Sequence, residues 1–158
     1  PGWVFYLHER LGRGGRRIRL LKFRTMKKKD DESRVHDWLQ AGVTQAEAHR
    51  VTRVGLFLRR HRLDELPQFF NVVMGDLNAV GPRAEGKMAF QERIKVIPGY
   101  ESRLTVMPGM AGWGLMHGYE DVREKLQFDM FYVKHRSFVF DLYIFLGTAW
   151  RIVCGTLK

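Results

Sequence analysis

The chain has 158 residues, of which 45% are hydrophobic and 28% charged; this composition suits one folded domain and excludes an intrinsically disordered protein. Its net charge of +10 favours polyanionic partners such as nucleic acid, nucleotide phosphates or an anionic membrane surface. Cys154 is the only cysteine, which excludes an internal disulfide and a cysteine-rich zinc site. The chain begins at Pro1 without Met and has no run of about 20 apolar residues, so we expect a piece of a longer protein, whose missing part could include a membrane anchor.

The first predicted element is a β-hairpin over residues 3–26. The runs WVFYLHER and RRIRLLKFRT are rich in aromatic and branched residues, and they flank LGRGG, whose glycines suit a tight turn. Residues 27–53 are polar and predict two short helices. One lies in VHDWLQAG and ends at Gly42, and the other begins at Thr44, where TQAE has the spacing of a capping box.

Residues 64–75 predict a helix with one apolar face. Asp64 is the expected N-cap, Pro67 falls in the first turn, and Gly75 ends the helix. The apolar residues recur at spacings of three and four: Leu66, Phe69, Phe70 and Val73. A carboxylate at this N-cap would be kept ionised by the helix macrodipole, which suits a structural cap as well as a nucleophile.

The last third of the chain predicts a glycine-rich loop, MPGMAGWG at residues 107–114, and then two helices. Residues 120–137 have the pattern of a long amphipathic helix. Residues 138–155 carry an apolar stripe, although the other sides are also apolar: Val139, Leu142, Tyr143, Leu146, Trp150 and Val153. Two interpretations remain open, a buried core helix or a helix in a membrane interface with Trp150 and Arg151 at the headgroups.

Basic residues surround the adjacent pair Asp64 and Glu65 in the sequence. They are Arg59, Arg60 and Arg62 before the pair, Arg83 in the turn VGPR after it, and Lys22 and Arg24 at the end of the hairpin. Arginine binds phosphate oxygens with two donors at once, lysine acts as a point charge, and carboxylates can bind Mg²⁺. Carboxylates among cations are typical of phosphoryl transfer, in which a metal bridges a diphosphate and a carboxylate attacks phosphorus.

The stretch RVTRVGLFLRRHRLDELPQFFNVVMGDLNAVGPRAE resembles the signature of bacterial polyprenyl-phosphate hexose-1-phosphate transferases, also called monotopic phosphoglycosyl transferases. ERLGRGG and LLKFRTM resemble the opening hairpin of that family, and PGMAGW and FDMFYVKHRSFVFDLYIFLGT resemble its closing region. The likeness thus covers most of the chain. The front lacks the hydrophobic membrane-entering helix of the family, and Ala84 stands where a second proline is common after VGPR.

The expected fold is α+β, a mostly helical single domain over residues 1–158 with an N-terminal β-hairpin and amphipathic, membrane-facing helices. The resemblance implies a catalytic domain that moves a sugar-1-phosphate from a UDP-sugar to undecaprenyl phosphate. It also implies release of UMP, a covalent phosphosugar intermediate on an aspartate, and a place at the cytoplasmic face of the bacterial inner membrane. Such a reaction initiates the synthesis of exopolysaccharide, capsule or O-antigen.

The resemblance assigns seven residues to the site. Asp64 would be the nucleophile and Glu65 the Mg²⁺ ligand; Lys22, Arg59 and Arg83 would contact phosphate, and Asp129 and Tyr132 would have supporting roles. The expected partners are the UDP-sugar, a polyprenyl phosphate and a membrane surface, with self-association left open and the sugar unidentified. The alternatives are an inactive assembly subunit of the same family and a basic nucleic-acid-binding module.

Overall fold

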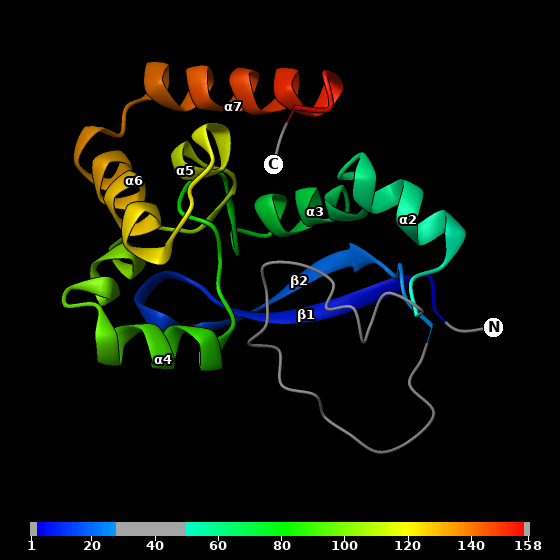
Figure 1. Ribbon diagram of the computed structural model, residues 1–158, viewed down its shortest axis with the longest axis horizontal. Coiled ribbons are helices and arrows are strands. Elements are labelled where there is room, and N and C mark those ends of the chain that lie inside the picture. The colour runs from blue at the N-terminus through cyan, green and yellow to red at the C-terminus, as the bar shows by residue number, and fades with distance from the viewer. Residues whose placement is uncertain (1–2, 28–49, 157–158) are drawn as a thin grey trace.

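The computed structural model describes residues 3–27 and 50–156, and helices predominate in it over two small sheets (Figure 1). The first sheet is an antiparallel pair of β1 (Phe5–Leu11) and β2 (Arg17–Phe23). The second is a parallel pair of β3 (Asn78–Val80) and β4 (Gly109–Ala111). The expected mostly helical α+β fold with an N-terminal hairpin is therefore confirmed.

The hairpin forms because both strands are rich in residues that favour extended backbone and because glycines make its turn. The 3₁₀ turn η1 (Arg13–Gly15) connects the strands, and Gly14 and Gly15 have φ angles of 64° and 78°. These left-handed angles suit glycine because it has no Cβ. On β2, Ile18 and Leu20 are buried and pack with Leu77. The predicted hairpin and its glycine turn are confirmed.

A second contact closes the chain on itself just beyond the hairpin. Met26 and Val51 form an antiparallel bridge, and the N–H of Lys27 donates to the carbonyl of Arg50 at 2.9 Å. The two short helices expected within residues 27–53 lie outside the described residues over most of their length. Helix α2 (Arg53–Arg60) begins directly after the bridge, with the Thr52 hydroxyl as its N-cap.

Helix α2 lies very close to the end of the hairpin because Gly55 has no side chain. A Cβ at Gly55 would come within 2.1 Å of the carbonyl oxygen of Thr25. The same Thr25 carbonyl accepts a hydrogen bond from the N–H of Thr52 at 3.0 Å. This approach brings the C-terminal end of α2, where Arg59 lies, beside the end of β2.

The prediction that Asp64 caps a helix is wrong. Arg62, with φ 56° and ψ 18°, is the only described residue other than glycine with a positive φ, and it turns the chain into the 3₁₀ turn η2 (Leu63–Glu65). Asp64 lies within this turn. The helix α3 (Gln68–Val73) begins only after Pro67, which occupies its N-cap position. The predicted end of the helix is confirmed at Gly75, where φ is 78°.

Helix α3 attaches to the hairpin through polar side chains. Its buried residues are Gln68 and Asn71. The Asn71 amide donates to the carbonyl of Arg19 at 2.8 Å, and its oxygen accepts from the N–H of Leu21 at 2.8 Å. The predicted apolar face therefore lies on the surface instead of in the core, as its residues are 45–86% exposed: Leu66, Phe69, Phe70 and Val73.

The remaining elements build the other half of the molecule (Figure 1). They are α4 (Lys87–Val96), the 3₁₀ helix η3 (Tyr100–Thr105), α5 (Trp113–His117), α6 (Val122–His135) and α7 (Phe138–Val153). The long helix predicted at 120–137 is confirmed as α6, which the Asp121 carboxylate caps. The glycine-rich segment 107–114 is more ordered than a loop, because it contains β4 and the first turn of α5.

Helix α7 packs over α5 and over the short parallel strands, on the far side of the molecule from the hairpin (Figure 1). Ile144 and Thr148 face inward and are buried. The predicted apolar stripe faces outward, with Val139 75% exposed and Trp150 69% exposed. The interpretation as a buried core helix is therefore wrong for this stripe. Within residues 3–27 and 50–156, no helix combines the length and hydropathy needed to cross a membrane.

Candidate active site

Three segments that are distant in sequence meet around the Glu65 carboxylate. Lys22 comes from the end of β2, Glu65 and Asp64 from η2, and Arg83 from the turn after β3. The Lys22 ammonium donates to Glu65 Oε1 at 2.9 Å. The Arg83 guanidinium donates to Oε1 at 2.7 Å and to Oε2 at 3.4 Å. Both oxygens of Glu65 are thus held by cations.

The charge state of Glu65 follows from these bonds. Burial alone would raise the pKa of this carboxyl, whose side chain is 15% exposed. The charges and hydrogen bonds of Arg83 and Lys22 outweigh burial and hold its pKa well below the usual range. Burial lowers the pKa of Lys22, while the opposite charge of Glu65 favours its ionised form. Glu65 is therefore a firmly ionised carboxylate at neutral pH.

Asp64 lies beside this ion pair in a different electrostatic state. Its pKa is raised, first by burial and then by the negative charge of Glu65, against the opposing effect of Lys22 and Arg59. The expectation that a helix N-terminus keeps Asp64 strongly ionised is thus incorrect, because no helix begins there. A carboxylate with a raised pKa is more basic than a free aspartate and is therefore a better nucleophile once ionised.

Arg59 is oriented toward the same place by the hairpin. Its Nε donates to the Thr25 hydroxyl at 2.8 Å, and its charge lowers the pKa of Asp64. The structure therefore brings together five of the seven residues that the resemblance implies: Lys22, Arg59, Asp64, Glu65 and Arg83. Three cations around two carboxylates leave a net positive charge, which favours an anionic ligand such as a diphosphate.

Asp129 and Tyr132 lie away from the two carboxylates. The Asp129 carboxylate accepts from the guanidinium of Arg103 at 2.7 Å. The Tyr132 hydroxyl donates to the Val80 carbonyl or the Asp141 carboxylate, at 3.2 Å and 2.9 Å. These side chains stabilise the packing of α6 against neighbouring segments.

Asp129 belongs to a buried group of charges that sequence reasoning missed. Glu85 accepts from Arg93, Arg103 and Lys125, and from the Tyr100 hydroxyl at 2.7 Å. These cations hold the pKa of Glu85 at about 2, although burial opposes them, and burial lowers the pKa of Lys125 to about 8. The sequence gives one signal only, an acidic residue directly after VGPRA, and charged residues are normally expected on the surface.

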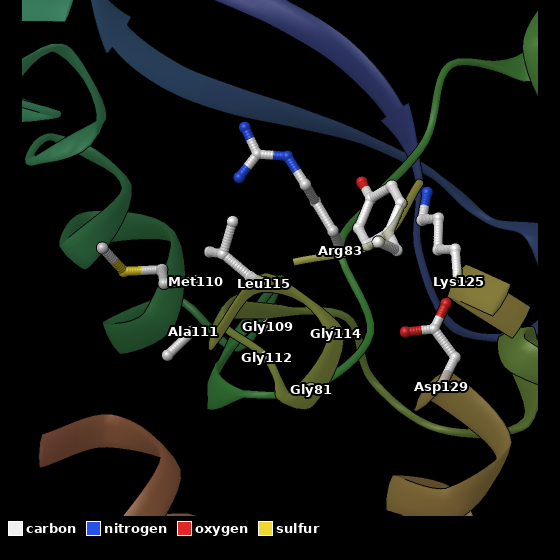
Figure 2. A pocket seen from close by; sticks show the side chains of 11 residues that line it. Gly81, Arg83, Gly109, Met110, Ala111, Gly112, Gly114, Leu115, Lys125 and Asp129 are labelled. Atoms are coloured by element: carbon white, nitrogen blue, oxygen red, sulfur yellow. The ribbon is translucent and has the colours of Figure 1, made fainter. Parts of the chain in front are cut away.

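A small pocket lies between this buried group and the turn that carries Arg83. Gly81, Gly109 and Gly112 line it, together with Lys125 and Asp129 from α6 (Figure 2). A Cβ at Gly109 would come within 2.0 Å of the Gly81 nitrogen, so the strands can approach this closely only without side chains there. Figure 2 shows the Arg83 guanidinium extending away from Lys125 and Asp129.

The carboxylate pair fits the chemistry of a magnesium ion that binds together with a substrate. Mg²⁺ usually takes one or two carboxylates and completes its shell with phosphate oxygens and water. Across residues 3–27 and 50–156, no three His, Cys, Asp or Glu side chains are grouped to hold a metal. Asp64 and Glu65 can supply oxygen ligands, and Glu65 would then release one of its two cations.

The chain belongs to the bacterial sugar transferases. The profile of the family described as Bacterial sugar transferase matches residues 1–155. The resemblance to this family that the sequence indicated is therefore confirmed.

Individual relatives agree with this family. The chain is 39% identical over 160 residues to the UDP-N-acetylgalactosamine-undecaprenyl-phosphate N-acetylgalactosaminephosphotransferase of Aeromonas hydrophila, covering 98% of this chain and 36% of that protein. It is 37% identical over 162 residues to the UDP-glucose:undecaprenyl-phosphate glucose-1-phosphate transferase of Xanthomonas campestris pv. campestris, covering 97% of this chain and 32% of that protein. It is also 35% identical to the exopolysaccharide production protein ExoY of Rhizobium meliloti (strain 1021), covering 93% of this chain and 69% of that protein. The chain spans about a third of the length of the first two relatives.

Proposed function

We propose that the protein transfers a sugar-1-phosphate from a UDP-sugar to undecaprenyl phosphate and releases UMP. The observation that carries the proposal is the grouping of Asp64 with Glu65 and their cations in a chain of the sugar transferase family. Relatives whose names specify this reaction differ in the sugar, N-acetylgalactosamine in one and glucose in another. The product would initiate synthesis of a polysaccharide such as exopolysaccharide, capsule or O-antigen.

In the first step, the Asp64 carboxylate attacks the phosphorus that carries the sugar. A bond forms between a carboxylate oxygen and this phosphorus, and the bond from phosphorus to the bridging oxygen breaks. The bridging oxygen leaves with UMP. Lys22, Arg59 and Arg83 bind the phosphate oxygens and stabilise the negative charge that gathers on the leaving group. The raised pKa of Asp64 supports its role as the nucleophile.

In the second step, an oxygen of undecaprenyl phosphate attacks the same phosphorus. The bond between phosphorus and Asp64 breaks, the carboxylate is regenerated, and a lipid diphosphate sugar leaves. A covalent intermediate allows the soluble donor product to depart before the lipid enters, so both can use one set of cations.

Glu65 is the residue proposed to hold a magnesium ion. Mg²⁺ would supply neutralisation of the diphosphate charge in addition to that from the protein cations. The Lys22 and Arg83 donors that hold Glu65 are then the ones able to turn toward phosphate.

The same proposal places the domain at the cytoplasmic face of the bacterial inner membrane. The outward stripe of α7 supports it, because six apolar residues along one helix face are 47–80% exposed: Val139, Leu142, Tyr143, Leu146, Trp150 and Val153. Such a face is stabilised by burial at the boundary of headgroups and acyl chains, and the net charge of +10 favours an anionic leaflet. The lipid acceptor would then be supplied from the surface on which the domain rests.

The test uses the intact protein in nanodiscs with a panel of UDP-sugars, Mg²⁺ or EDTA, and with or without undecaprenyl phosphate. We expect UMP release with a particular sugar, its loss in Asp64→Asn and in EDTA, and its retention in the control Asp76→Asn. Asp76 is a suitable control because it pairs with Arg16 at 2.9 Å, away from the site. We also expect a mass increase of one sugar phosphate on the wild-type protein when the acceptor is omitted.

Two results would overturn the proposal in different ways. UMP release that is undiminished in Asp64→Asn would mean that Asp64 has a structural role only. The absence of UMP with every donor, in a folded protein supplied with lipid, would leave an inactive assembly subunit as the better interpretation.

A further inference from the structure

Arg103, on η3, is buried at the centre of the charged group, with 3% of its surface exposed. All three nitrogens of its guanidinium are bonded. Nε and one terminal nitrogen bind Asp129 at 3.0 Å and 2.7 Å, and the other terminal nitrogen binds Glu85 at 2.6 Å. The terminal nitrogen that binds Glu85 also donates to the Tyr100 hydroxyl at 3.1 Å.

One further bond of Arg103 leads toward the candidate active site. The terminal nitrogen that binds Asp129 also donates to the backbone carbonyl of Arg83 at 2.9 Å. Arg83 is the residue whose guanidinium binds both oxygens of Glu65. A chain of direct contacts therefore runs from Asp129 through Arg103 and Arg83 to the carboxylate beside Asp64.

We infer that Arg103 is a positioning residue for the phosphate site, which fixes the backbone at Arg83 and thereby the guanidinium that faces Glu65. This inference rests on the proposed function. The Arg83 side chain is 36% exposed, and Glu65 is the only described side chain that it hydrogen-bonds, so its direction depends on where its backbone is held. Figure 2 shows Asp129 on one side of this backbone and the guanidinium extending to the other.

The geometry requires arginine at position 103. Its four partners come from three segments: Asp129 from α6, Glu85 and Arg83 from the stretch after β3, and Tyr100 from η3. A planar fork of five N–H donors can bind all of them at once, whereas a lysine ammonium has a single nitrogen. Arg103→Lys keeps the buried charge, but it should lose either the bond to the Arg83 carbonyl or the bond to one of the two carboxylates, Asp129 or Glu85.

The experiment is a double-mutant cycle on the intact protein with two measurements, the dissociation constant for UDP and kcat/KM for UMP release. The variants are Arg103→Lys, Arg83→Gln and the double variant. We expect Arg103→Lys alone to reduce kcat/KM up to about a hundredfold, as misplacement of a site by about 1 Å does. We expect the double variant to bind UDP and to release UMP as well as Arg83→Gln alone does, because Arg103 acts through Arg83.

Arg93→Lys is the matched control. Arg93 is another arginine bound to Glu85, but it has no contact with the Arg83 backbone among the described residues. We expect this control to retain wild-type UDP affinity and turnover. If Arg103→Lys does not fold, Asp129→Asn replaces it in the cycle, because it weakens the hold on the guanidinium with little change of shape.

The outcomes separate the two proposals. The positioning role would be overturned if the losses of kcat/KM in the two single variants multiply in the double variant. It would also be overturned if Arg93→Lys loses as much kcat/KM as Arg103→Lys. Either result would leave Arg103 as a purely structural residue. A wild-type protein that neither binds UDP nor releases UMP would instead overturn the proposed function itself.

Discussion

The Lys22 ammonium lies 2.9 Å from Glu65 Oε1, and this ion pair connects β2 with the turn that carries Asp64. Both partners affect the pKa of the Asp64 carboxyl. Burial raises its pKa most, Glu65 raises it further, and Lys22 lowers it. The ion pair therefore modifies the pH at which the proposed nucleophile becomes active, in addition to the larger effect of burial.

This relationship predicts opposite shifts in the acid limb of the pH profile. Asp64 must be ionised to attack, so kcat/KM should fall as the pH falls through a pKa above the ordinary 3.8 of aspartate. Lys22→Met removes the larger of the two effects of positive charge that lower this pKa, so the limb should move to higher pH, with a loss of rate of about a hundredfold. Glu65→Gln removes a negative neighbour, so the limb of its residual activity should move to lower pH.

The measurement is UMP release from about pH 4 to about pH 8 for the three proteins. Lys27→Met serves as the control, because Lys27 is exposed and lies beyond the hairpin. A limb that moves in the same direction in both variants would show that it belongs to a group other than Asp64.

Asn71 predicts a large stability effect at a position that no sequence pattern marks. Its side chain binds the backbone of Arg19 and of Leu21, and it is 1% exposed. Asn71→Ala leaves a carbonyl and an N–H of β2 without partners, so the free energy of unfolding should fall by about 2 to 4 kcal/mol. Asn78→Ala, at an exposed position on β3, should change it by no more than about 0.5 kcal/mol. Urea unfolding measures both, and similar losses would argue against this anchoring role.

Glu85 predicts how stability depends on acid. Its pKa of about 2 lies below the ordinary 4.5, so its contribution is complete above pH 4.5 and is lost as the pH falls toward 2. Glu85→Gln should cost about 3 kcal/mol at neutral pH, and the difference from wild type should shrink as the pH falls through this range. Urea unfolding at several pH values tests this against the exposed control Glu101→Gln. A difference that stays constant with pH would contradict the assignment.

The outward face of α7 predicts an effect on membrane binding without an effect on folding. Leu146 is 57% exposed, so Leu146→Asp should change the free energy of unfolding by no more than about 0.5 kcal/mol. Its binding to anionic vesicles should fall by about tenfold or more, because one buried leucine contributes about 2 kcal/mol. Gln127→Asp adds the same charge at an exposed position of α6 and is the control. Equal binding by all three proteins would place this stripe away from the membrane.

Local sequence patterns predict the elements of this fold well, but not their contacts. The glycines at 14 and 15 and the spacing of apolar residues in α6 are local features, and both elements occur as expected. The pair of β3 and β4 joins two three-residue strands that are far apart in sequence, and the glycines that permit it resemble a loop. The sequence places the start of α3 too early, because the left-handed turn at Arg62 cannot be seen in a residue type that rarely adopts it.

The candidate site likewise has residues that the sequence predicts and contacts that it does not. The cations near Asp64 can be found because they match basic positions in the motifs of the family, and the structure gathers them there. The bond from Arg103 to the Arg83 carbonyl depends on the backbone path of two separate segments, which no residue pattern specifies. Apolar periodicity also does not say which side is buried: in α3 the polar side binds the hairpin, and in α7 the stripe faces outward.

The bridge at Met26 and Val51, with the hydrogen bond from Lys27 to Arg50, has a consequence for the geometry of the candidate site. The chain leaves the hairpin and returns to it at neighbouring points, so the number of residues inserted between them does not set the separation of Lys22 and Arg59. The pairing of these two points therefore helps to hold the hairpin that carries Lys22 beside the helix that carries Arg59.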